Sequence, residues 1–97
     1  MIHRNGQSLG EAIREFFEEN TELRGKILTA RALRAWGEVL GPIAAKYTRD
    51  VYIKDKVLYV FLTSAVLRNE LMLCRERLVK SLNDHVGAEV IQEIIIR

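Results

Sequence analysis

The spacing of apolar residues changes along the chain, and these changes limit the folds it can adopt. Apolar residues recur at helical spacing over residues 9–17, directly after Ser8, which suits a helix N-cap. Helical spacing resumes over about residues 22–40, and Gly41 and Pro42 follow. Glycine suits the position after a helix and proline cannot continue one. We therefore expect two successive helices in the first 40 residues.

The spacing then shortens to two, which is typical of β-strands. Residues 49–54 and 57–63 alternate in this way and are expected to form a hairpin, although the usual turn glycine is missing. Helical spacing returns over residues 65–86, and Gly87 marks the end of this long helix. Residues 88–97 are rich in valine and isoleucine, which favours a third strand.

The expected order is therefore ααββαβ. Because the last helix joins the second and third strands, those two strands can pair in parallel. We predict one α+β domain over residues 1–97, in which residues 1–7 are flexible. It should contain a three-stranded mixed sheet with helices packed on one face.

Composition excludes several classes of protein. Hydrophobic residues make up 48% of the 97 residues and charged residues 29%, as in ordinary globular proteins. No apolar run approaches the roughly 20 residues of a membrane span, and the first residues lack the apolar stretch of a signal peptide. We therefore expect a cytoplasmic protein with no membrane contact.

Few residues could carry out catalysis. Cys74 is the only cysteine, and it lies on the apolar stripe of the expected 65–86 helix, where a buried, inert thiol is common. His85 is eleven residues further along, roughly 16 Å on a helix axis, so the two cannot form a catalytic pair. Metal-ligand clusters and phosphate-binding glycine loops are missing from the sequence. We expect no enzyme activity, no metal and no cofactor.

Charge is distributed unevenly along the chain. Residues 1–22 contain five acidic and two basic residues, whereas residues 23–97 contain eight acidic and thirteen basic residues. Such a distribution can orient a polyanion toward one side of a protein, although both segments could equally be solvated surfaces. Basic residues near the expected hairpin are candidates for binding single-stranded DNA or RNA weakly through phosphates. They are Lys46, Arg49, Lys54, Lys56 and Arg68.

The hairpin also carries apolar residues on both of its faces. Tyr52, Tyr59 and Phe61 alternate out of phase with the aliphatic residues expected to face the helices. Ile91 and Ile95 can join them on this second face. Three explanations are open: the first helix covers this face, a protein partner or second copy covers it, or its aromatic rings stack on unpaired bases. We expect Tyr59 or Phe61 to stay accessible in the monomer.

Several short segments, in this order and spacing, resemble the bacterial DciA-like family over residues 8–97. The segments are WGEVLG at 36–41, IAAKYT at 43–48, LYVFLTSAVL at 58–67, NEL at 69–71 and LN at 82–83. The resemblance implies a K-homology-like domain that takes part in loading or operating the replicative helicase. The G-x-x-G loop with which K-homology domains clamp nucleic acid is missing from this sequence.

The sequence therefore predicts a small non-enzymatic adaptor that binds nucleic acid weakly and has the replicative helicase as its partner. The alternative is a protein-interaction module, or a homodimer formed through the sheet, with no role in nucleic-acid binding. Salt distinguishes the two, because phosphate contacts weaken steeply with ionic strength and apolar interfaces do not.

Overall fold

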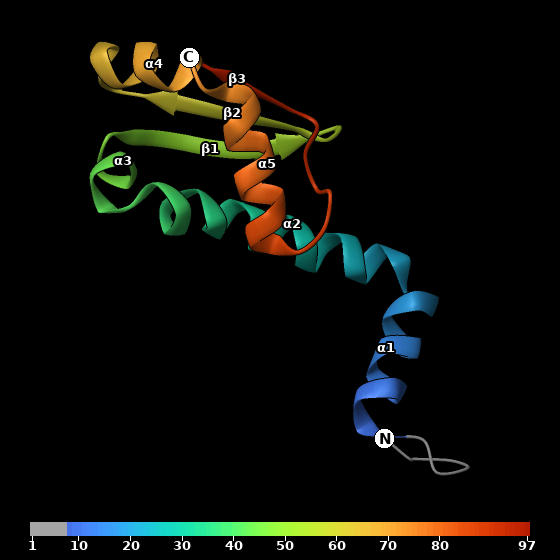
Figure 1. Cartoon of the computed structure of the whole chain (residues 1–97). Coiled ribbons are helices and arrows are strands. Elements are labelled where there is room, and N and C mark those ends of the chain that lie inside the picture. The colour runs from blue at the N-terminus through green and yellow to red at the C-terminus, as the bar shows by residue number, and fades with distance from the viewer. Residues whose placement is uncertain (1–7) are drawn as a thin grey trace.

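The computed structural model describes residues 8–97, so the expected flexibility of residues 1–7 lies outside it (Figure 1). Within these residues the elements follow one another as α1 (Leu9–Glu19), α2 (Thr21–Leu40), α3 (Pro42–Lys46), β1 (Thr48–Lys54), β2 (Val57–Leu62), α4 (Ala65–Met72), α5 (Arg75–Val86) and β3 (Glu93–Ile96). The predicted α+β class and the mixed three-stranded sheet are confirmed.

Side-chain caps fix the helix starts that the sequence predicts. The Ser8 Oγ accepts a hydrogen bond of 3.1 Å from the Glu11 backbone N–H at the start of α1. The Ser64 Oγ accepts one of 3.2 Å from the Leu67 N–H at the start of α4. Each bond satisfies a backbone donor that the first helical turn leaves unpaired. At the C-terminal end of α5, Gly87 adopts a left-handed φ of 85°, as a glycine after a helix commonly does.

Helix α3 was not predicted, because five residues are too few to show a helical period. Gly41 ends α2 with a φ of 88° and turns the chain, and Pro42 then occupies the first turn of α3. Both residues were expected to end α2, and they do. They also start a second, short helix that leads into β1.

The predicted long helix over residues 65–86 is wrong in one respect, because it is two helices. The chain turns at Leu73 and Cys74, where the Cys74 N–H bonds to the Leu71 carbonyl at 3.1 Å. Leu71 and Leu78 are both buried, so the apolar spacing of the sequence continues across the break. The turn allows α4 to pack against β2 and β3 while α5 packs against α2 and β3.

The sheet has the order β1-β2-β3, with β1 and β2 antiparallel and β2 and β3 parallel. Both pairings agree with the sequence prediction. One irregularity interrupts the hairpin: Thr48 pairs with Leu62 and Asp50 with Phe61, so Arg49 has no partner of its own. This is a β-bulge, which adds one residue to one strand and re-aims its side chain.

The hairpin turn uses Asp55 and Lys56 where glycine is common. Their φ angles are 52° and 63°, so both residues are in the left-handed region. Turns of this type match the twist of the strands and favour Asn-Gly or Asp-Gly. A lysine in this conformation carries a steric cost that glycine does not.

Lys56→Gly is therefore expected to stabilise the protein. Removing the Cβ strain should raise the free energy of unfolding by about 1 kcal/mol. Urea denaturation of the variant and the wild type measures the difference. A Lys56→Ala variant keeps the Cβ and should show no such gain, so equal gains in both variants would contradict the explanation.

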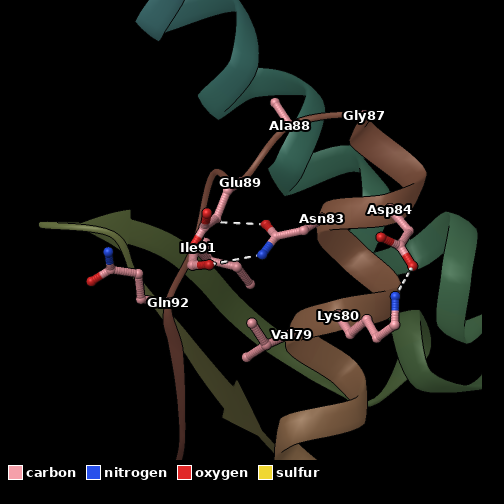
Figure 2. A pocket seen from close by; sticks show the side chains of 9 residues that line it. All are labelled: Val79, Lys80, Asn83, Asp84, Gly87, Ala88, Glu89, Ile91 and Gln92. Carbon is pink, nitrogen blue, oxygen red and sulfur yellow. Dashed lines mark hydrogen bonds and ion pairs between the residues drawn. The ribbon is translucent and has the colours of Figure 1, made fainter.

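The third strand is shorter than predicted, because residues 88–92 are not in a strand. The Asn83 amide holds this segment: its Nδ2 donates to the Ile91 carbonyl at 2.8 Å, and its Oδ1 accepts from the Val90 and Ile91 N–H groups at 3.0 and 3.1 Å. Figure 2 shows Asn83 reaching from α5 to Ile91. Ile91 is buried in the core, so its expected place on the outer sheet face is wrong.

Most of the buried residues within 8–97 cluster between the sheet and the helices. Trp36 is 2% exposed within this cluster. Its Nε1 donates to the Thr48 Oγ1 at 2.9 Å, and that hydroxyl donates to the Ala44 carbonyl at 2.7 Å. Trp36 thus joins α2, α3 and β1 around the core.

Candidate binding face of the sheet

The two faces of the sheet differ in their surroundings. The inner face contains residues such as Leu58, Val60 and Ile94, which are buried against the helices. Tyr59 and Ile95 pair in register and alternate with these residues, so they point to the outer face. Both are half-buried. The expected place of Ile95 on the second face is therefore confirmed.

Helix α1 does not cover the outer face, which removes one of the three explanations. It contacts α2 and points away from the sheet (Figure 1). Tyr52 on the outer face is 41% exposed, and Tyr59 and Phe61 are half-buried. The expectation that Tyr59 or Phe61 stays accessible thus agrees with the structure.

Three stacked aromatic rings form the centre of this surface, and we call Tyr52, Tyr59 and Phe61 the aromatic face. The ring centroids of Tyr52 and Tyr59 lie 4.8 Å apart at an interplanar angle of 16°. Those of Tyr52 and Phe61 lie 5.9 Å apart at 22°. Cross-strand aromatic neighbours stabilise a hairpin, so part of this stacking supports the fold itself.

Arg49 lies at one end of the aromatic face. Its guanidinium carbon is 5.6 Å from the centroid of the Phe61 ring, within the range of a cation–π interaction. The bulge at the start of β1 gives Arg49 this position, because the regular alternation of the strand is interrupted there. The sequence predicted Arg49 as a candidate but gave no sign of this contact.

Lys54 and Lys56 lie at the opposite end of the hairpin. Lys54 pairs with Val57, which alternates in step with Tyr59 and Phe61, so Lys54 belongs to the outer face by register. Lys56 is in the turn itself. From Arg49 to Lys54 the strand extends roughly 17 Å, at about 3.3 Å per residue. The predicted basic residues therefore flank the aromatic face at both ends and do not form one cluster.

Two other predicted residues lie near the start of the hairpin. Lys46 ends α3, and its Nζ is 5.9 Å from the centroid of the Tyr47 ring. Arg68 on α4 is half-buried, and its Nη2 donates to the Leu62 carbonyl at 3.3 Å. Arg68 thus helps to hold the end of β2, a structural role that the sequence prediction did not include.

Carboxylates also lie on the outer face. Asp50 pairs with Phe61 and Glu93 pairs with Val57, so both residues share the face by register. The Asp50 Oδ1 accepts a hydrogen bond of 2.9 Å from the Val51 N–H. These two negative charges oppose the basic residues, which limits the affinity of this surface for a polyanion.

The residues considered for catalysis lie apart from one another. Cys74 packs partly against the core at the α4–α5 turn, with its Sγ 3.5 Å from the Leu71 carbonyl oxygen. His85 lies on α5, where its Nε2 is 3.4 Å from a Glu38 carboxylate oxygen. Among residues 8–97, no group of three or more His, Cys, Asp or Glu side chains is placed to hold a metal ion.

A cleft of about 840 Å³ lies between α5 and the segment that leads into β3. Figure 2 shows the side chains that line this cleft, and its dashed lines mark the hydrogen bonds of Asn83 and of the Lys80–Asp84 pair. The Asn83 side chain holds residues 90 and 91 through three hydrogen bonds. Lys80 donates to the Asp84 carboxylate at 2.8 Å, and this hydrogen bond and charge raise the pKa of Lys80 above its ordinary value. Asn83 thus has a structural role, and Lys80 and Asp84 are paired with each other on the surface of α5.

No described helix within residues 8–97 has both the length and the hydrophobicity needed to cross a membrane.

Comparison with known proteins identifies the family. No curated protein is significantly similar to the chain. A family model described as "Dna[CI] antecedent, DciA" matches residues 8–96, which is nearly the whole chain and covers the sheet, its aromatic face and the helices around them. The resemblance seen in the sequence is thereby confirmed. The chain belongs to the DciA family, the family of helicase loaders.

Proposed function

We propose that the protein is a non-enzymatic adaptor in replication that binds the replicative helicase and, weakly, single-stranded DNA on the outer face of its sheet. Membership of the DciA family supports the helicase-loading role. The proposed DNA-binding role is supported by the aromatic face, which the helices do not cover and which Arg49 and Lys54 flank.

Stacking and charge would act together on such a surface. Each base has an apolar face, so aromatic side chains bind single strands with little sequence preference, at about 1–3 kcal/mol per stacked base. The exposed Tyr52 ring is best placed for this contact. Arg49 and Lys54 would then neutralise phosphates on either side of the rings. Asp50 and Glu93 on the same face keep the expected affinity low.

Removing the basic residues should abolish DNA binding. In the variant with Lys46, Arg49, Lys54 and Lys56 all changed to glutamine, a labelled oligo-dT should show no binding at low salt by fluorescence anisotropy. For the wild type, four phosphate contacts predict a slope of about −3 in a plot of log K against log salt.

A matched variant controls for the overall loss of charge. Lys26, Arg75, Arg77 and Lys80 are exposed and lie on α2 and α5, outside the hairpin that carries the aromatic face. Changing these four residues to glutamine removes the same charge and should leave most of the binding intact. If this control loses binding and the first variant keeps it, the DNA lies along α5 and the proposal is wrong.

The helicase contact has its own test. Tagged protein is used to capture binding partners from an extract of the native host, and mass spectrometry identifies them. We expect the replicative helicase among them, and direct binding to the purified helicase should follow. Failure of the purified helicase to bind would contradict the adaptor role.

A protein-interaction module without DNA binding is the second candidate. Asp50 and Glu93 favour it, because carboxylates on the aromatic face repel a polyanion. The aromatic face would then contact a protein partner through Tyr52, Tyr59 and Phe61. The absence of wild-type binding to any oligonucleotide at low salt would select this candidate.

A further inference from the structure

The first part of the described chain extends away from the rest of the molecule. We call residues 9–31, which comprise α1 and the first half of α2, the N-terminal arm. The molecule measures 57 × 25 × 21 Å and its radius of gyration is 16.5 Å. A compact domain of this length has a radius of gyration near 12.5 Å. Figure 1 shows the arm as the source of this elongation, with α1 turned away from the sheet.

The arm exposes several large apolar side chains to water. Five large apolar side chains along it are between 38% and 52% exposed: Leu9, Ile13, Phe16, Leu23 and Ile27. Helix α1 has only 11 residues, and helices this short are marginal in water without tertiary contacts. Leu9, Ile13 and Phe16 share one face of α1 by helical spacing, as Leu23 and Ile27 do on α2, and exposed apolar faces of this kind indicate an interface.

The charges of the arm indicate what covers it. Helix α1 carries four glutamates and one arginine. The adjoining residues 21–31 carry Arg24, Lys26 and Arg31 with one glutamate. The two halves of the arm thus have opposite net charge. A cleft of about 390 Å³ between α1 and α2 has Phe17, Ile27 and Leu28 in its lining, with Glu18 and three arginines around them.

We propose that two copies of the chain associate through their N-terminal arms, antiparallel and related by a two-fold axis. The acidic α1 of each copy then lies against the basic start of α2 in the other copy, and the exposed apolar side chains of both arms are buried together. A two-fold contact of this type uses the same patch on both copies and closes after two subunits. It leaves the aromatic face of the sheet free, so it does not depend on the proposed DNA binding.

Apolar substitutions in the arm test the contact. Sedimentation velocity over a range of concentrations should show the wild type approaching twice the monomer mass of 11.2 kDa. In the variant with Ile13 and Phe16 changed to serine, the dissociation constant should rise about thirtyfold or more, because central aromatic anchors dominate interfaces. Near-ultraviolet circular dichroism of Trp36 checks that the core stays folded.

The matched control changes apolar residues that are even more exposed but lie outside the arm. Ile43 on α3 and Val66 on α4 are 72% and 74% exposed. Changing both to serine removes as many large apolar side chains as the arm variant and should leave the dimer intact. Equal dissociation of both variants would contradict an interface located in the arm.

Charge reversal tests the antiparallel pairing directly. One variant carries Glu18→Lys and Glu19→Lys, and a second carries Arg24→Glu and Arg31→Glu. Each alone should be monomeric, because like charges face each other in its own dimer. Mixed together, they should form a heterodimer, since α1 of each then meets a complementary α2. Contacts within one chain cannot be restored by mixing.

Two results would overturn the proposal. One is a wild type that stays monomeric at about 100 µM, a concentration at which even micromolar affinities are saturated. Another is the failure of the two charge variants to associate when mixed. If the wild type is monomeric and the arm variant also loses helicase binding, the helicase is the partner of the arm.

Discussion

Trp36→Ala is expected to cause the largest loss of stability of any single substitution considered. The side chain is 2% exposed and joins α2, α3 and β1. Truncating a buried aromatic residue costs about 3–5 kcal/mol, against a total stability of about 5–15 kcal/mol for a typical domain. For a typical dependence on urea, the denaturation midpoint should fall by about 2 M.

Two control variants separate packing from hydrogen bonding. Trp36→Phe keeps most of the ring but loses the Nε1–H donor to Thr48, and should cost less than the alanine change. Tyr47→Ala truncates an aromatic side chain that is 40% exposed and should cost about 1 kcal/mol or less. A midpoint for Trp36→Ala close to that of Tyr47→Ala would contradict the central place of Trp36 in the core.

The second large effect is on binding. Changing Tyr52 and Phe61 to serine should weaken oligo-dT binding about thirtyfold or more, because each stacked base contributes about 1–3 kcal/mol. The same change should lower stability by only about 1–2 kcal/mol, the scale of strand propensity and cross-strand pairing. Fluorescence anisotropy and urea denaturation of one preparation measure both effects.

A conservative variant provides the matched control. Tyr52→Phe with Phe61→Tyr keeps both rings and should retain most of the binding. If the serine variant instead loses as much stability as Trp36→Ala, these rings belong to the core. If it binds DNA as well as the wild type, the aromatic face does not contact the bases.

Much of the fold could be predicted from the sequence, because each long element repeats its apolar period several times. Helices α1 and α2 and the hairpin agree with the predicted ranges to within one or two residues. Three features could not be predicted. Helix α3 is shorter than two helical turns, and Leu71 and Leu78 keep helical spacing across the α4–α5 turn. The late start of β3 depends on the distant Asn83 side chain.

The candidate site was predictable in its residues but not in its arrangement. Alternation placed Tyr52, Tyr59 and Phe61 on one face of the sheet, and the register confirms that placement. A bulge depends on how two strands pair, so the contact of Arg49 with Phe61 has no signature in one strand alone. The structural role of Arg68 likewise depends on where α4 packs, which the sequence does not specify.

The most direct test of the DNA-binding surface is an amide NMR titration of the wild-type protein with oligo-dT at low salt. Chemical-shift changes should centre on the two strands of the hairpin, β1 and β2, with the largest changes at Arg49, Tyr52 and Phe61. Added salt should reverse them. Changes confined to α5 and the residues leading into β3, or no changes at all, would contradict the proposal that single-stranded DNA binds the outer face of the sheet.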